Sequence, residues 1–203
     1  GPDSFSYTVK DNTGAVSNPA TVSLTVTAVN DAPVANVESV TLAEDANAVI
    51  DVLANDSDAN RDAGDRIAIV AVDESNLRGS ISIDGGSIIY SGAGAFQELG
   101  EGETAIDSFS YTVADSAGAQ SSADVNVTVT GVNDAPEAVA DAISLSEDAA
   151  PATIDVLGND NDPDANDTRT IVSVDPTGLN GSVTIADDGS AVIYAVASAY
   201  QLL

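Results

Sequence analysis

The chain has 203 residues, of which 33 are Asp or Glu and 5 are Lys or Arg, and its formal net charge is −28. A chain this acidic repels nucleic acid and anionic membranes, so neither is an expected partner. It contains no Cys and no His, which excludes disulfides, thiolate metal sites, histidine-based zinc hydrolase sites and Ser-His-Asp triads. No apolar run is long enough to cross a bilayer, and we expect no membrane insertion. The hydrophobic fraction of 43% falls in alternating runs, which favours a folded chain over a disordered one.

Two sequence landmarks repeat with nearly the same period. DSFSYTV at 3–9 recurs at 107–113, and VNDAP at 29–33 recurs at 132–136. The offsets are 104 and 103 residues. A period of about 100 residues is the size of one small β-sandwich domain. The chain is therefore predicted to be a slice of a tandem array, cut out of phase with its repeat.

Segments rich in Val, Ile, Thr and Tyr that alternate apolar with polar residues predict strands. Residues 5–9 and 22–26 come first and form a predicted hairpin. Seven further strands are predicted near residues 37–42, 48–53, 66–72, 79–84, 87–91, 108–114 and 123–130. Seven short strands, with no segment of helical periodicity, predict an all-β fold of seven-stranded immunoglobulin- or cadherin-like β-sandwich repeats in tandem.

The period divides the chain into three parts. Residues 1–33 carry the C-terminal hairpin of an incomplete repeat and a linker. Residues 34–133 form one complete repeat, and residues 134–203 carry the N-terminal strands of a third, truncated repeat. The third part stops where its final hairpin would begin, and the first part is that hairpin from another copy.

The two incomplete ends have two possible fates. An open sheet edge recruits strands from a neighbouring molecule, which would join copies head to tail. Such a heterologous contact generates rings or open filaments. The alternative is that the end fragments stay partly unfolded.

Two acidic loops carry the clearest candidate chemistry. They have the sequences NDSDANRDAGD and NDNDPDAND, and their carboxylates are Asp56, Asp58, Asp62, Asp65, Asp160, Asp162, Asp164 and Asp167. Alternating Asp or Asn residues project hard oxygen ligands toward one point, which suits Ca²⁺. An EF-hand is excluded, because the sixth and twelfth positions counted from Asp56 are Arg61 and Ile67 instead of Gly and Glu. A solvated acidic loop is the alternative.

The VNDAP joints add further oxygens at the seams, from Asn30, Asp31, Asn133 and Asp134. In a seven-strand sandwich, the loop between the second and third strands lies at the N-terminal pole. The loops after the first and fifth strands lie at the C-terminal pole, with the acidic residues Glu44, Asp45, Glu101, Glu103 and Asp107. Carboxylates from both sides of a joint would repel each other without a cation and hold one between them. The pattern predicts an interdomain calcium site; the alternative is a plain flexible linker.

Taken together, VNDAP, the Glu-Asp pair before the second strand, DVLANDSD and AFQELGEGETAIDSFSYTVAD resemble the VCBS/cadherin-like tandem repeats of bacterial RTX-type and biofilm-associated surface adhesins. The resemblance implies long exported proteins, located at the bacterial cell surface or secreted, built from calcium-stiffened β-sandwich repeats that serve cell adhesion and biofilm formation. It implies calcium ligands at the first joint drawn from Asn30, Asp31, Asp56, Asp58, Asp62 and Asp65. At the second joint it implies Glu44, Asp45, Asn133, Asp134, Asp160, Asp162, Asp164 and Asp167.

Two functions remain open at this level, a calcium-stiffened structural extender and a calcium-dependent module that binds carbohydrate such as exopolysaccharide. Sugar sites usually present aromatic platforms, and only 4% of the residues are aromatic. Those in alternating strands are predicted to be core (Phe5, Tyr7, Phe109 and Tyr111), and packing is the favoured interpretation for Tyr90, Phe96, Tyr194 and Tyr200. An enzyme is not expected, because the carboxylates form a repeated pattern and do not flank one unique cleft.

Overall fold

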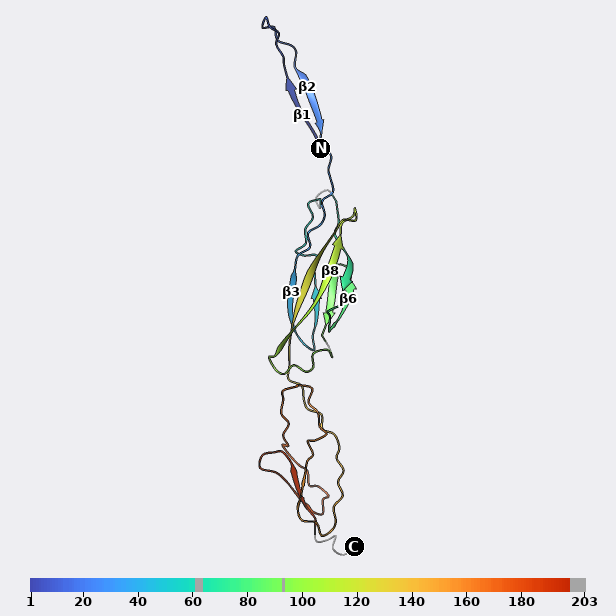
Figure 1. Ribbon diagram of the computed structural model, residues 1–203, viewed down its shortest axis with the longest axis vertical. Helices are drawn as coiled ribbons and strands as arrows, with labels where there is room; N and C mark the ends of the chain where they lie inside the picture. Colours follow the sequence, from blue (N-terminus) through green and yellow to red (C-terminus); the bar gives the residue numbers. More distant parts are fainter. Residues whose placement is uncertain (61–63, 93, 198–203) are drawn as a thin grey trace.

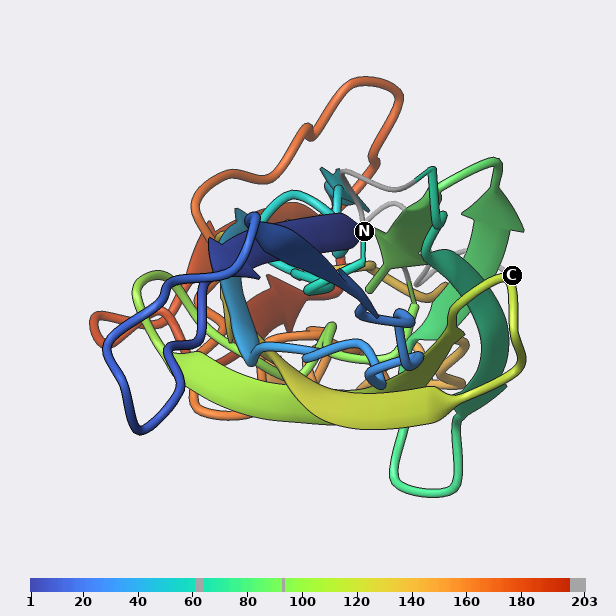
Figure 2. The same ribbon diagram turned by 90° about the horizontal axis from the view of Figure 1, so that it is seen from above.

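The structure is a computed structural model that describes residues 1–60, 64–92 and 94–197. Three parts follow one another along a single long axis (Figure 1), and they lie behind one another when viewed along it (Figure 2). We call them the N-terminal hairpin (residues 1–28), the central repeat (34–131) and the C-terminal unit (137–197), joined by linkers at 29–33 and 132–136. Two residues of the sequence predictions, Asp62 and Tyr200, lie outside the described residues. No described segment forms a helix that could cross a membrane.

The central repeat is a sandwich of two sheets, as predicted. The first sheet has the order β3 (Glu38–Ala43), β9 (Gln120–Thr130), β8 (Thr104–Ala114) and β5 (Ala68–Asp73). The second sheet has the order β4 (Asn47–Ile50), β7 (Ser87–Ser91) and β6 (Ser80–Asp84). The first and last strands, β3 and β9, run parallel, and the other pairs are antiparallel. The seven-stranded all-β architecture is confirmed.

The core of the central repeat comes from the apolar positions of the alternating strands. β8 supplies Phe109, Tyr111 and Val113, and every second residue of β9 from Val125 to Val129 joins them, all at most 4% exposed. Ile88 and Tyr90 of β7 face them from the other sheet and are fully buried. Burying a large apolar side chain stabilises a fold by about 1.5–3 kcal/mol, so these strands account for much of the stability of the repeat.

Strand ends differ from the prediction at several places, two of which have a clear cause. β8 begins at Thr104, four residues earlier than expected, because it stays paired with β9 along its whole length. The strand predicted near 48–53 ends at Ile50, because the Ala54 N–H donates to the Asp51 carbonyl (3.1 Å) and turns the chain.

The N-terminal hairpin consists of β1 (Pro2–Tyr7) and β2 (Ala20–Thr25). Its register pairs Phe5 with Val22, as β8 and β9 pair Phe109 with Val125. No described strand of the chain covers the hairpin, which projects from one end of the molecule (Figure 1). Its apolar residues are therefore exposed, although the sequence predicted them as core.

The C-terminal unit forms one sheet only, in the order β10 (Ala152–Ile154), β12 (Val192–Ala195) and β11 (Ser182–Ile185). This sheet corresponds to β4, β7 and β6 of the central repeat. IVSVD at 171–175, the counterpart of β5, is not a strand. β5 is held by pairing with β8, and among the described residues of the C-terminal unit no strand corresponds to β8.

Candidate metal centre

The C-terminal joint, where the central repeat meets the C-terminal unit, is built around Glu44. Glu44 follows the last residue of β3, and its N–H donates to the Thr130 carbonyl at the end of β9 (3.0 Å). The side chain is fully buried, and its Oε1 accepts the Val132 N–H (2.8 Å). The parallel pairing of β3 with β9 therefore sets this carboxylate directly beside the linker.

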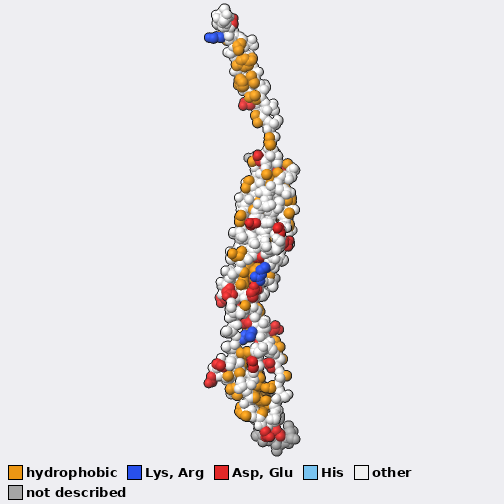
Figure 3. All heavy atoms as spheres, in the orientation of Figure 1, with side chains coloured by type: hydrophobic (Ala, Val, Ile, Leu, Met, Phe, Trp, Pro, Cys, Tyr) orange, Lys and Arg blue, Asp and Glu red, His pale blue; other side chains and the backbone are white. Residues whose placement is uncertain are grey.

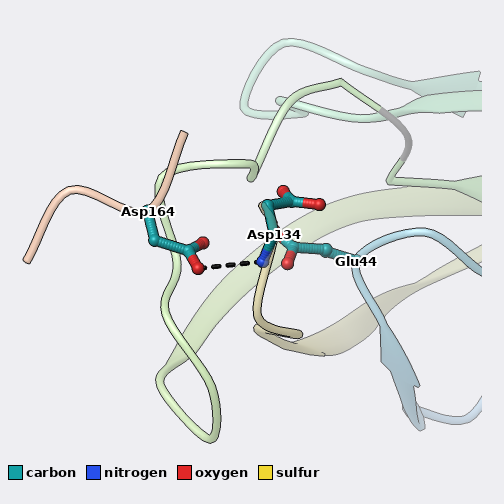
Figure 4. Close-up of side chains that lie close together, drawn as sticks. All are labelled: Glu44, Asp134 and Asp164. Carbon is teal, nitrogen blue, oxygen red and sulfur yellow. Dashed lines mark hydrogen bonds between the residues drawn. The ribbon is translucent and has the colours of Figure 1, made fainter. Parts of the chain in front are cut away.

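Two carboxylates from the other side of the joint meet Glu44 (Figure 4). Asp134 belongs to the linker, and its N–H donates to Asp164 Oδ2 (2.9 Å). Asp164 is 1% exposed and comes from the acidic loop of the C-terminal unit, where its own N–H donates to Asp162 Oδ1 (3.1 Å). One oxygen each of Glu44, Asp134 and Asp164 lies within 4.8 Å of the other two.

Each of these three carboxylates has an oxygen that is buried and has no hydrogen-bond partner among the described residues: Glu44 Oε2, Asp134 Oδ2 and Asp164 Oδ1. Burial raises the pKa of Glu44, and the nearby charge of Asp134 raises it further. Burial also raises the pKa of Asp134, assisted by the charges of Asp45 and Asp164. The negative form of the cluster is therefore disfavoured unless a positive charge joins it.

The arrangement fits Ca²⁺. This ion takes six to eight oxygen ligands at 2.3–2.6 Å, so two oxygens on one ion can be up to about 5 Å apart. The three carboxylates satisfy that spacing with oxygen donors alone. They come from the central repeat, the linker and the C-terminal unit, so an ion held by all three would bridge the joint.

The remaining contacts of the C-terminal joint bring the expected loops together. Asn166 Nδ2 donates to Glu103 Oε1 (2.9 Å), and the Ala165 N–H donates to the Glu98 carbonyl (3.1 Å). Three other residues predicted as ligands at this joint lie on the surface, outside the group of three carboxylates. Asn133 and Asp167 are exposed, and exposed Asp45 accepts a hydrogen bond from Gln97 (3.1 Å).

The N-terminal joint holds a second group of carboxylates, Asp58, Asp65 and Asp115, with one oxygen of each again within 4.8 Å of the others. Asp115 Oδ2 accepts the side-chain amide of Asn30 (2.7 Å), and this bond holds the Asp115 pKa below its usual value. The Ser116 N–H donates to Asp65 Oδ1 (2.8 Å), and this hydrogen bond lowers the pKa of Asp65 in the same way. Of these three residues, only Asp58 keeps a buried oxygen without a partner among the described residues. This group is better stabilised by protein donors than the group at the C-terminal joint.

Asp115 was missed by the sequence predictions. It lies in the turn between β8 and β9, where its Oδ1 accepts the N–H groups of Ala117 (2.9 Å) and Ala119 (2.8 Å). Asp and Gly in a hairpin connection indicate a turn. Asp115 was therefore interpreted as a turn residue only, and its place in the carboxylate group at the N-terminal joint was not predicted. A signal was present, since Asp11 occupies the same place in the N-terminal hairpin and makes the same bond to Ala15 (2.9 Å).

Two of the predicted ligands accept hydrogen bonds from backbone N–H groups that lie shortly after the linkers. Asp56 Oδ1 accepts the Asn36 N–H (2.8 Å) and the Tyr111 hydroxyl (2.9 Å), which ties the acidic loop to the core. Asp160 makes the matching bond to the Val139 N–H in the C-terminal unit (2.7 Å). Neither residue belongs to a carboxylate group described above, although Asp56 Oδ2 is also buried without a partner among the described residues.

The two joints differ at one equivalent position. At the C-terminal joint the Asp134 N–H is accepted by Asp164, whereas at the N-terminal joint the Asp31 N–H is accepted by Asn60 Oδ1 (2.7 Å). The exposed Asp31 side chain belongs to neither carboxylate group. The backbone geometry of the linkers is thus repeated, with a neutral amide at the N-terminal joint where the C-terminal joint has a carboxylate.

Comparisons with known proteins agree with this architecture. A sequence model described as a bacterial cadherin-like domain matches residues 30–131, and one described as a bacterial Ig domain matches residues 133–202. Neither description is that of an enzyme. No curated protein matches the chain.

Several solved cadherin structures are similar to the chain. Protocadherin gamma B7 extracellular cadherin domains 1–4 match with a TM-score of 0.50 at 18% identity, over 97% of this chain and 49% of that one. Protocadherin gamma B2 domains 1–5 match at 0.49 and 17%, over 95% and 44%. Drosophila N-cadherin EC1–4 matches at 0.43 and 14%, over 81% and 40%. This chain spans less than half of each of these structures. The gamma B7 match, with its TM-score of 0.50, indicates a similar fold, and at 18% identity it indicates no more than the fold. With the cadherin-like sequence model matching half of the chain, the chain belongs to the bacterial cadherin-like domain family.

Proposed function

We propose that the chain is a structural extender segment of a bacterial surface adhesin, in which Ca²⁺ at the C-terminal joint fixes successive repeats in line. The observation that carries the proposal is the convergence of Glu44, Asp134 and Asp164 from three different segments, each with a buried oxygen that lacks a partner among the described residues. Carboxylates placed this way across a joint favour a divalent cation over solvent.

Electrostatics explains how the ion would act. Two carboxylates about 4 Å apart repel each other by roughly 4 kcal/mol at an effective dielectric constant of 20. Without a cation the repulsion pushes the linker and the acidic loop away from Glu44. A bound Ca²⁺ reverses the sign and ties all three segments together. Asp45 and Asp162, whose charges act on Asp134, are the candidates to complete its coordination.

The location and the biological role belong to the same proposal. Stiff repeats joined in a row hold an adhesive tip away from a cell, which suits a secreted or cell-surface protein of the RTX or biofilm type. In the central repeat, the carbohydrate-binding alternative gains no support from the aromatic residues. Tyr90, Phe96 and Tyr111 are fully buried in the central repeat and cannot form a sugar platform there.

Calcium binding at this joint is tested first by titration calorimetry at physiological salt, with Mg²⁺ as the control for non-specific attraction to a polyanion. The wild-type chain is expected to bind Ca²⁺ with a defined stoichiometry and to bind Mg²⁺ much more weakly. The variant pair Glu44→Gln with Asp164→Asn should lose the strongest site. Asp124→Asn removes one charge from the exposed face of β9 and should keep it. Equal binding by all variants, or none by the wild type, would contradict the proposal.

The stiffening is tested separately by a distance measurement across the joint. The chain has no Cys, so spin labels can be placed at Ser122→Cys in the central repeat and Thr184→Cys in the C-terminal unit, both exposed positions. Calcium is expected to narrow the distribution of label distances, and chelator to broaden it. A distribution that calcium does not change would show that the ion does not set the geometry of the joint.

A further inference from the structure

Residues 94–103 lie between β7 and β8 and reach from the core of the central repeat to the C-terminal joint; we call them the strap. Phe96 is fully buried, and Leu99 packs against the core from a partly buried position. Two tight turns follow one another. The Leu99 N–H donates to the Phe96 carbonyl (3.0 Å), and the Glu103 N–H donates to the Gly100 carbonyl (2.9 Å). The strap is therefore a folded segment that is anchored in the core.

The strap is also fixed to the chain where β9 ends. The Gly131 N–H donates to the Glu103 carbonyl (2.8 Å), and the Gly102 N–H donates to the Gly131 carbonyl (3.2 Å). A Cβ on Gly131 would lie 2.4 Å from the Leu99 carbonyl oxygen, a distance that only glycine avoids. The strap therefore lies directly against the chain just before the linker.

A basic side chain holds the strap in position. Such side chains are rare, since the chain has 5 Lys and Arg in all, and Figure 3 shows few of them among many acidic groups. The Arg78 side chain donates to the Ala95 carbonyl and to Glu98 Oε1 (2.6 Å). Its guanidinium carbon lies 4.2 Å from the centroid of the Phe96 ring. A half-exposed ion pair alone contributes little to stability, but the three contacts together fix the position of residues 95–98.

The remaining contacts of the strap cross the joint. The Glu98 carbonyl accepts the Ala165 N–H (3.1 Å), and Glu103 Oε1 accepts a hydrogen bond from Asn166 Nδ2 (2.9 Å). Ala165 and Asn166 directly follow Asp164 in the acidic loop of the C-terminal unit. Neither contact needs an ion, because each pairs a donor of one unit with an acceptor of the other.

We propose that the strap fastens the C-terminal unit to the central repeat without calcium, and that Arg78 is the residue that positions it. The proposal does not depend on the calcium proposal, because its contacts involve none of the three carboxylates around Glu44. The joint then has two separate attachments. Repulsion between carboxylates acts on Asp164 when no cation is bound, while the strap retains the next two residues of the same loop. In chelator, the motion of the C-terminal unit is therefore limited by the strap.

Hydrogen exchange in chelator tests the contact at a single amide. The Ala165 N–H is expected to be protected in the wild type. Arg78→Met removes the donors but keeps an unbranched apolar side chain, and it should speed exchange at Ala165 about two- to tenfold, the factor for losing one hydrogen bond. Exchange at Val127 in β9 should stay the same, because the bond from the residue 78 N–H to Asp107 does not involve the side chain. An unprotected Ala165 in the wild type, or equal exchange in Arg78→Met, would overturn the proposal.

A distance measurement across the joint, also in chelator, tests the consequence for the whole unit. Spin labels at Ser122→Cys and Thr184→Cys report the range of positions that the C-terminal unit takes. The distribution of label distances should be broader in Arg78→Met and in Glu103→Ala than in the chain that keeps both residues. Glu103→Ala acts directly, because it removes the acceptor of the Asn166 side chain.

Two controls remove the same charges elsewhere. Arg66→Met changes an exposed residue at the other end of the central repeat, and Glu101→Ala changes an exposed residue of the strap itself. Both should leave the distribution as it is. Equal distributions in all the chains, or equal broadening by the controls, would overturn the proposal. No ion is present in these measurements, so a negative result would refute the strap and leave calcium binding at the joint untouched.

Discussion

The two hairpins of this chain share a sequence pattern and a pairing register but not an environment. Gly14 and Gly118 both adopt φ 92° in the connections, and Asp11 and Asp115 cap them in the same way. Yet Phe5 is 54% exposed and Phe109 only 4%. The hairpin itself is specified locally by its turn and its alternation, whereas burial requires the rest of a sandwich. Three pairs of equivalent substitutions in the hairpins separate these two contributions, and a fourth pair compares Glu44 with its counterpart in the C-terminal unit.

The largest difference is expected for Phe109→Ala against Phe5→Ala. Removing a buried Phe side chain costs about 3–5 kcal/mol, so Phe109→Ala should lower the melting temperature of the central repeat by more than about 12 °C. Phe5→Ala should change the free energy of unfolding of the central repeat by less than about 0.5 kcal/mol in dilute protein. Scanning calorimetry checks both variants. A similar loss from the two would mean that the N-terminal hairpin already packs against the central repeat.

The next pair is Asp107→Asn against Asp3→Asn. Asp107 is 2% exposed and accepts hydrogen bonds from the Arg78 and Gly79 N–H groups and the Tyr90 hydroxyl. An amide presents a donor where these donors need acceptors, which should cost about 1–3 kcal/mol. Asp3 is exposed, and its substitution should have no measurable effect on the central repeat. Denaturant unfolding followed by circular dichroism measures the difference. An Asp107→Asn variant with the unfolding midpoint of the wild type would contradict the prediction.

A smaller effect is expected for Tyr111→Phe against Tyr7→Phe. The Tyr111 hydroxyl donates to Asp56 and lies 2.8 Å from the Asn36 carbonyl oxygen, so its removal should cost about 0.5–1.5 kcal/mol. It should also speed hydrogen exchange at the Asn36 amide, which shares Asp56 as its acceptor. The Tyr7 variant should leave exchange in the central repeat as it is. Faster exchange in both variants would indicate a contact of the hairpin with this region.

The smallest effect is expected for Glu44→Gln against Glu147→Gln, its exposed counterpart in the C-terminal unit. The pKa of Glu44 is raised in the folded chain above its ordinary value of 4.5. A raised carboxyl pKa means that the folded state keeps its proton to a higher pH than the unfolded state does. Stability therefore falls as the pH rises above the pKa of the unfolded state. In chelator at pH 7, Glu44→Gln should therefore melt slightly higher than the wild type, and this gain should vanish below pH 4.

Calcium should reverse the order of Glu44→Gln and the wild type at pH 7, because the ion needs the charged carboxylate. Glu147→Gln should follow the wild type in both conditions, within about 0.5 kcal/mol. Thermal melts in calcium and in chelator at several pH values check this. A Glu44→Gln variant that is less stable in chelator would show that the charged form is favoured without a cation.

The sequence predicted the fold of the central repeat almost completely. Alternation located all seven strands, since strands buried on one face must place apolar residues at every second position. It did not show that IVSVD at 171–175 would stay irregular or that Phe5 and Tyr7 would be exposed. Both depend on strand partners, and a strand's own residues do not reveal whether its partner is present.

The site was predicted in outline. The period located the joints, and the loop order placed Glu44 opposite Asp164. The spacing of acidic residues could not tell which side chains turn toward the joint. Asp56 and Asp160 turn inward to accept the backbone N–H groups of Asn36 and Val139. Asp115 turns toward the N-terminal joint from a hairpin turn that the sequence did not distinguish from others.

The parallel pairing of β3 with β9 has a mechanical consequence. Tension along the molecule enters the central repeat at β3 and leaves it at the end of β9. Because the two strands run parallel, from the Glu38–Val125 pair to the Ala43–Thr130 pair, pulling slides them past each other in opposite directions. The hydrogen bonds between them are then loaded together in shear, whereas an antiparallel pair pulled from its open end would unzip one bond at a time. The strand order thus lets the repeat bear tensile load along the direction in which its neighbours are joined.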